Sequence, residues 1–337
     1  MVAVNAWVGL RIEKLAPESS LDNVIELERR IAQAPDKAAV KVLVFGNSHA
    51  VAGLRPPAIA AAIGVRPEEV FSLAMPGASP REMRLLAERH LPSFPAARQA
   101  VIGVDEYFLS AHPDVRVRHL TRGSILERWR YAATFPKLDD RLGLMAGMLL
   151  PVADYAVALR LCAVREPALT ARRLVMDVPV RPNSLQSRLA AISYPWGYPP
   201  PWDDKDLGKL MAMDWEPAKR AWHLMGDADE VPAGIEELDR LVRMLESRGA
   251  RLTLAEMPYD QPLAAALARA TNYRRHYKQP LEAYMAASGR AIVPAPAVSA
   301  RHFYDLDHLN PEGAELMAGW LKKRLVSQTD VWIGGQP

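Results

Sequence analysis

The sequence contains a single cysteine, and this scarcity excludes two kinds of structure. With Cys162 alone, no intramolecular disulfide can form and no group of thiolates can bind zinc. The cysteine content leaves open whether the protein works in an oxidising or a reducing compartment.

A strong excess of charge of one sign is also missing. The net charge is +3 over 337 residues, and Lys and Arg are mixed with Asp and Glu along the chain. A dedicated nucleic-acid binder concentrates positive charge, so we expect no nucleic-acid partner.

The N-terminal hydrophobic run is shorter than the ~20 residues that span a bilayer. The segment "MVAVNAWVGL" is apolar for ten residues and then meets Arg11, and it lacks the basic start of a signal peptide. Two interpretations stay open: the last turns of a membrane anchor that begins outside this chain, or an apolar helix lying on the domain. We assign residues 1–35 to this segment and the helix after it.

Short apolar runs alternate with stretches of helical periodicity, which is the pattern of an α/β fold. Continuous apolar runs favour strands of a parallel sheet that is covered on both faces. We therefore expect a three-layer α/β/α sandwich, similar to flavodoxin, within residues 36–337. The predicted strands are 41–45, 70–73, 100–104, 251–257 and 291–295, and the predicted helices include 21–31, 80–91, 234–247, 273–287 and 311–326.

The interval from about 111 to 232 interrupts this alternation. It contains an apolar run at 143–164 and an irregular aromatic tract, "SYPWGYPPPWDD", at 193–204. Because the α/β pattern resumes afterwards, we interpret the interval as a mostly helical insertion. The apolar run contains Pro151, Asp154 and Arg160, so we expect it either at a lipid interface or over the core as a lid.

Two segments carry the residues of a candidate site. In "DLDHLNPEGA", Asp305 precedes His308 by three residues, so its carboxylate can accept the Nδ1 proton and leave Nε2 free as a base. In "VFGNSHA", Ser48 follows a predicted buried strand, and a turn there lies at the edge where α/β folds bind ligands. Ser48 is either a turn residue that only bonds its local backbone or a nucleophile, and the Asp305–His308 pair favours the nucleophile.

Three segments together resemble the SGNH (GDSL-like) hydrolase and acyltransferase superfamily. "GNSH" is similar to its first block, "AMPGAS" to its second and "DLDH" to its fifth, over roughly residues 41–110 and 234–326. The resemblance implies that Ser48 is the nucleophile and that Asp305 and His308 complete a triad. It also implies that the backbone N–H groups of Ser48 and Gly77 form an oxyanion hole.

The chain departs from that pattern at two positions. Asn47 stands where the first block has Asp, and Asp105 stands where the third block has an Asn that donates to the oxyanion. An ionised Asp105 cannot donate, and losing one such donor costs ~10²–10³ in rate. Either the backbone donors suffice, or Asp105 has another role, such as positioning Asn47, His49 or a substrate hydroxyl.

The neighbouring residues have simpler expected roles. His49 is equally compatible with a structural and a supporting catalytic role, Asp307 is expected to be solvated, and His302 is expected at the surface. The remaining histidines show no metal-ligand spacing, so we expect no metal and no cofactor.

Two classes of function follow. The first is a serine-dependent esterase or O-acyltransferase that acts through an acyl-Ser48 intermediate. The alternative is a weak or inactive relative that binds a polysaccharide or a membrane acyltransferase partner. The ending "DxxHLNxxGA" resembles the branches that O-acylate extracellular polysaccharides, which implies an acylated carbohydrate substrate and an extracytoplasmic, membrane-associated location. Oligomeric state stays open.

Overall fold

The computed structural model describes residues 21–110, 115–121, 124–133, 138–149, 217, 221, 231–270 and 273–329. These residues divide into two compact units. One unit holds the β-sheet and the other holds the helices between residues 115 and 149.

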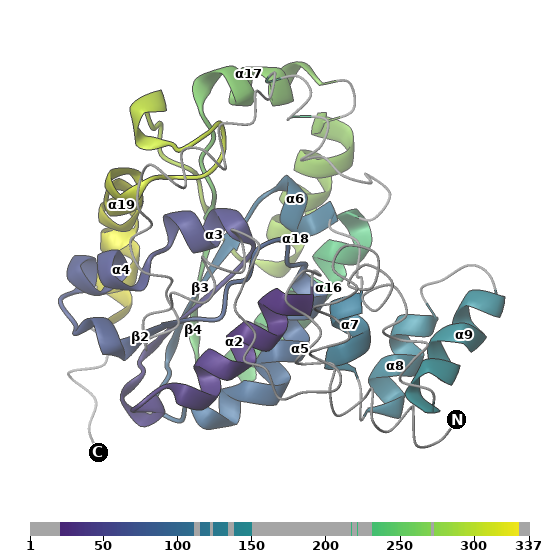
Figure 1. Ribbon diagram of the computed structural model, residues 1–337. Helices are drawn as coiled ribbons and strands as arrows, with labels where there is room; N and C mark the ends of the chain where they lie inside the picture. The colour runs from purple at the N-terminus through teal and green to yellow at the C-terminus, as the bar shows by residue number, and fades with distance from the viewer. Residues whose placement is uncertain are drawn as a thin grey trace, which may run out of the picture. The chain divides into compact units, whose positions relative to one another are not determined.

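The sheet has five parallel strands in the order β2-β1-β3-β4-β5. Figure 1 shows the sheet among its helices, with β2, β3 and β4 labelled. The strands are β1 (Val42–Phe45), β2 (Val70–Ser72), β3 (Gln99–Val104), β4 (Arg251–Glu256) and β5 (Ile292–Val293). All five match predicted strands, although β5 keeps only two of the five residues expected. Every residue of β1, β2 and β3 is buried, as a parallel sheet covered on both faces requires.

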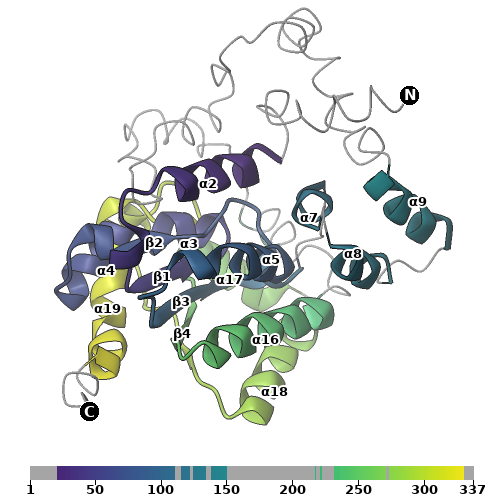
Figure 2. The same ribbon diagram turned by 90° about the horizontal axis from the view of Figure 1, so that it is seen from below.

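Helices cover both faces of this sheet (Figure 2). The chain moves from β1 to β2 in one direction and then crosses back over β1 to β3, so right-handed crossovers place the connecting helices on opposite faces. The helices α3 (Ser48–Gly53), α4 (Pro56–Ile63) and α19 (Pro311–Thr329) pack together on one side, and α5 (Pro80–His90), α16 (Val231–Ser247) and α18 (Gln279–Ser288) on the other.

The remaining helices of this unit are short. They are α6 (Glu106–Ser110) and α17 (Gln261–Arg269), with single turns at η1 (Lys37–Ala39), η2 (Pro67–Glu69), η3 (Leu91–Ser93) and η6 (Ala300–His302). The helix α2 (Leu21–Gln33) is divided between the units, with residues 21–29 in the other one. The predicted helix 273–287 is divided: a π-helical turn, η5 (Arg274–Lys278), precedes α18. Pro280 explains the division, because proline removes a donor and displaces the carbonyl four residues earlier.

The core on one face shows how the candidate site is supported. Val42, Val44 and Val101 of the sheet pack against Leu54 and Met317 of the covering segments. These apolar contacts hold α3 and α19 beside each other. The serine turn (residues 46–48) leads from β1 into α3, and the histidine loop (residues 303–310) leads into α19.

The second unit contains most of the described part of the interval 111–232. Besides residues 21–29 of α2 it holds α7 (Val115–Leu120), α8 (Ile125–Ala132) and α9 (Leu138–Leu149), so the described segments of the interval in this unit are helical. The N-terminal segment 1–20, the aromatic tract 193–204 and the apolar run beyond Leu149 lie outside the described residues. Among the described helices, none is long and apolar enough to cross a membrane.

Candidate active site

The serine turn is built by the residues that leave β1. Gly46 has φ +139°, a conformation that L side chains rarely adopt, and a Cβ there would lie 2.5 Å from that of Ala50. Asn47 then caps α3, its side-chain oxygen accepting a hydrogen bond from the His49 N–H at 3.0 Å. Ser48 is thereby the first residue of α3, half-buried at the edge of the sheet.

The histidine loop is a compact turn immediately before α19. The Asp305 carboxylate accepts hydrogen bonds from the backbone N–H groups of Asp307, at 2.9 Å, and His308, at 2.7 Å. Phe303 and Leu309 close the turn with an antiparallel bridge, and Asn310 caps the helix through the Gly313 N–H. These contacts position the His308 imidazole without any help from a substrate.

The two segments meet in a continuous hydrogen-bond chain. His308 Nε2 lies 3.0 Å from Ser48 Oγ, and His308 Nδ1 lies 2.8 Å from Asp305 Oδ2. Because an ionised carboxylate only accepts, the Nδ1 proton is donated to Asp305 and a neutral ring accepts the hydroxyl proton at Nε2. The contact expected between Asp305 and His308 is therefore present, and Ser48 completes the chain.

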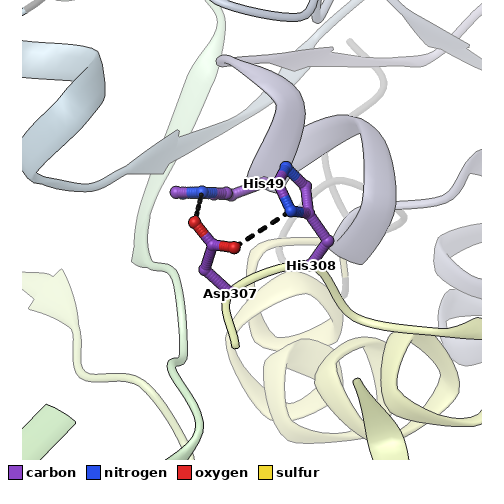
Figure 3. A group of neighbouring side chains, drawn as sticks. All are labelled: His49, Asp307 and His308. Atoms are coloured by element: carbon purple, nitrogen blue, oxygen red, sulfur yellow. Dashed lines mark hydrogen bonds and ion pairs between the residues drawn. The ribbon is translucent and has the colours of Figure 1, made fainter. Parts of the chain in front are cut away.

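Asp307 is buried, and the expectation that it is solvated was wrong. Its carboxylate lies between two imidazoles: Oδ2 accepts a hydrogen bond from His49 Nε2 at 2.9 Å, and Oδ1 lies 3.1 Å from His308 Nδ1 (Figure 3). The error arose because the sequence spacing draws attention to Asp305 and His308 only. In the structure Asp305 forms an Asx turn with the Asp307 N–H, and the Asp307 side chain faces inward. His308 Nδ1 thus faces two carboxylates.

His49 is an ion pair partner of two buried carboxylates. Besides the Asp307 contact, its Nδ1 lies 2.9 Å from Asp105 Oδ2, a contact close in distance but not aligned as a hydrogen bond. Burial lowers the pKa of His49, but the charges of Asp105 and Asp307 outweigh it and raise the pKa to about 10. His49 is therefore an imidazolium at neutral pH.

The same charges act on the other members of the cluster. Burial lowers the pKa of His308, yet Asp307 and Asp305 together raise it above its ordinary value. Burial would raise the pKa of Asp307, but the two histidines His308 and His49 hold it well below its usual range. The charges of His49 and Asp307 therefore stabilise each other.

Asp105 has a supporting position behind α3. Its Oδ1 accepts hydrogen bonds from Asn47 Nδ2 at 2.9 Å and from the Phe108 N–H at 2.8 Å, and its Oδ2 faces His49. Of the roles considered for Asp105, positioning Asn47 and His49 is the one that these contacts support. The two departures at positions 47 and 105 are thus one hydrogen-bonded pair.

Gly77 lies in the turn that follows β2. Because β2 is the neighbour of β1, this turn reaches the same edge of the sheet as Ser48. Gly77 has φ +66°, which glycine adopts without strain, and is half-buried.

A second buried carboxylate, which the sequence analysis did not single out, lies next to Asp105. Glu106 accepts hydrogen bonds from the hydroxyls of Tyr259 and Tyr273, and burial raises its pKa. The Tyr259 ring in turn packs edge-on against His49, with ring centroids 5.8 Å apart. Both tyrosine partners of Glu106 are more than 150 residues away along the chain, so no local pattern could have indicated these hydrogen bonds.

His49, Asp307 and His308 are the described residues that come nearest to a metal-binding group, with ligand atoms within 4.8 Å of one another. Each atom is already used: Asp307 bridges the two rings, and His308 Nδ1 donates to Asp305. We therefore assign the group as a hydrogen-bond and ion-pair network. His302, expected at the surface, is buried: it ends the turn η6, and Gly313 of α19 packs so close that a Cβ there would lie 3.2 Å from the His302 Cβ.

No model of a known protein family matches the chain, and no curated protein shows significant similarity to it.

Proposed function

We propose that the protein is a serine-dependent ester hydrolase or O-acyltransferase of the SGNH type. The observation that carries this proposal is the hydrogen-bond chain from Ser48 Oγ through His308 to Asp305. These three side chains lie beyond the carboxyl end of β1. The strand that follows β1 in the sequence, β2, pairs on one side of it and β3 pairs on the other, so the strand order reverses at β1. Open α/β sheets bind their ligands at such a position.

The arrangement suits a two-step acyl transfer. In the first step Ser48 Oγ attacks the ester carbonyl carbon while His308 Nε2 takes the hydroxyl proton. His308 then returns that proton to the leaving alkoxide, which releases an alcohol and leaves acyl-Ser48. In the second step water or a sugar hydroxyl gives its proton to His308 and attacks the acyl carbon, and Ser48 Oγ leaves with the proton.

The developing oxyanion needs hydrogen-bond donors, and we propose that backbone N–H groups supply them. Ser48 begins α3, and Gly77 stands in the neighbouring turn, so we assign their N–H groups to the oxyanion. Asp105 does not contribute, because its carboxylate is directed at Asn47 and His49. We propose that no cofactor or metal takes part in the reaction.

The substrate class comes from the resemblance alone. We propose an acylated, in particular acetylated, carbohydrate as the substrate and a cell-envelope location outside the cytoplasm. A membrane-bound acyltransferase would be the donor of the acyl group if the protein transfers rather than hydrolyses.

The alternative is a binding module that keeps the fold without turnover. The loss of a side-chain donor at position 105 favours it, because one oxyanion contact is missing. The buried network argues the other way, because a binding module has no need for a histidine flanked by two carboxylates.

Labelling with a fluorophosphonate separates the two functions. We expect covalent modification of the wild type at Ser48, none in Ser48→Ala, and undiminished labelling in Ser299→Ala, which changes an exposed serine as a matched control. A folded wild-type protein that never reacts would leave only the binding module.

A further inference from the structure

His49 is a buried side chain that the proposed reaction does not use. Both of its ring nitrogens face carboxylates, and its ring centroid lies 4.9 Å from that of His308. Two carboxylates hold it in place from opposite sides, Asp105 from the end of β3 and Asp307 from the histidine loop.

We propose that His49 is a permanently charged positioning residue, which compensates the second carboxylate beside His308 and so keeps the base within the pH range in which it can accept a proton. This inference rests on the proposed function of Ser48 and His308. It adds a role to a residue for which the sequence leaves a structural and a supporting role open.

The charges around His308 show why compensation is needed. His308 Nδ1 lies 2.8 Å from Asp305 Oδ2 and 3.1 Å from Asp307 Oδ1. Two anions at one ring nitrogen favour the imidazolium, and an imidazolium cannot accept the proton of Ser48. A cation shared with Asp307 offsets one of these anions, so that His308 is oriented by a carboxylate pair but experiences less than two full negative charges.

The groups that face the two rings come from four elements. His308 meets Asp305 and Asp307 of its own loop, and Ser48 and His49 of α3. The charged and titratable groups that face His49 are Asp105 after β3, Asp307 and His308 of the loop, and Tyr259 after β4, whose hydroxyl donates to Glu106.

The burial of His49 excludes a direct contact with a substrate. The side chain is 2 % exposed, and both of its ring nitrogens face carboxylates. Its pKa of about 10 agrees with a charge that persists throughout the working range of the base. Its effect on the reaction is therefore transmitted through Asp307.

The rate of fluorophosphonate inactivation, measured against pH, tests the proposal without a known substrate. The acid limb of this profile reports the protonation of His308. His49→Gln removes the cation and keeps a donor, so we expect the limb to move to higher pH by about 1–2 units. Asp307→Asn removes the compensated anion, so we expect the limb to move to lower pH.

The double variant His49→Gln/Asp307→Asn distinguishes charge from packing. Cation and anion are lost together, so the limb should return to within a few tenths of a unit of the wild type, even if the maximum rate stays reduced. His276→Gln, which changes a half-buried histidine outside the network, is the matched control and should leave the profile unchanged. Rate losses in both single variants with no movement of the limb would overturn the proposal.

Nitrogen NMR of the wild-type rings keeps the test valid if the variants fail to fold. We expect both ring nitrogens of His49 to carry protons from pH 6 to pH 8.5, while His308 loses one of its protons on titration. A neutral His49 at pH 7.5 would overturn the proposal. A wild type that fails to react with the fluorophosphonate but shows this NMR pattern would refute the proposed function and leave the charge on His49 established.

Discussion

Raising the pH should destabilise the fold through His49. The folded pKa is raised from 6.5 to about 10, so the folded state keeps a proton that the unfolded chain releases between these values. The stability that this proton provides is fully present below pH 6.5 and is lost as the pH rises towards 10. The free energy of unfolding should fall by about 1.4 kcal/mol per pH unit from about pH 7.5 to 9, and by about 5 kcal/mol over the full range.

Urea unfolding at half-unit steps of pH and constant ionic strength measures this slope. Asp105→Asn is the informative variant, because the amide still accepts from Asn47 and from the Phe108 N–H but no longer carries a charge. It lowers the pKa of His49, so the falling part of the curve should move to lower pH. Breaking one of the two ion pairs should also cost about 3–5 kcal/mol at pH 7.

The control is again His276→Gln, whose curve should run parallel to that of the wild type. A wild-type stability that is flat between pH 7.5 and 9 would show that His49 is not held as a cation. The same conclusion would follow if Asp105→Asn left the position of the curve unchanged.

Four further outcomes are expected. Ser48→Ala and His308→Ala should each abolish turnover of a small aryl acetate, and the double variant should be little worse than either; clearly additive losses would mean that the two residues do not share a mechanism. Asp105→Asn should lower that turnover, because the carboxylate holds His49; a higher rate would place Asp105 at the oxyanion instead. Gly46→Ala should destabilise the fold by about 2 kcal/mol or more in urea unfolding, since its methyl would collide with α3. Liposome flotation should retain lipid binding after deletion of residues 1–15 if the insertion makes the contact, and lose it if only the N-terminal segment does; a full chain that never floats excludes direct lipid contact by both.

The fold was predictable because its signals are local. The strand β1 and the greater part of β3 are continuous apolar runs, and alternation with helices predicts a parallel sheet. Two boundaries were misplaced although each has a local signal: β5 ends at Val293, directly before Pro294, and the π-helical turn precedes Pro280. In both places proline removes a backbone donor, which the apolar and helical patterns alone do not show.

The candidate site was predictable only where its residues are close in the sequence or directly follow a strand. The contact between Asp305 and His308 follows from a three-residue spacing, and Ser48 follows from its place after a strand. The partners of His49 are 56 and 258 residues away, so the burial of Asp307 and the charge of His49 emerge only when three strand ends are brought together.

The bond between Asn47 and Asp105 ties together the starts of two helices. Asn47 caps α3 after β1, Asp105 accepts from the third residue of α6 after β3, and one hydrogen bond joins the two caps. We therefore expect substitutions at positions 47 and 105 to be coupled in evolution. A carboxylate at both positions would place two negative charges face to face, and an amide at both would leave His49 with one anion. Related chains that diverge at position 47 should therefore have diverged at position 105 as well, and the two should be read as one character.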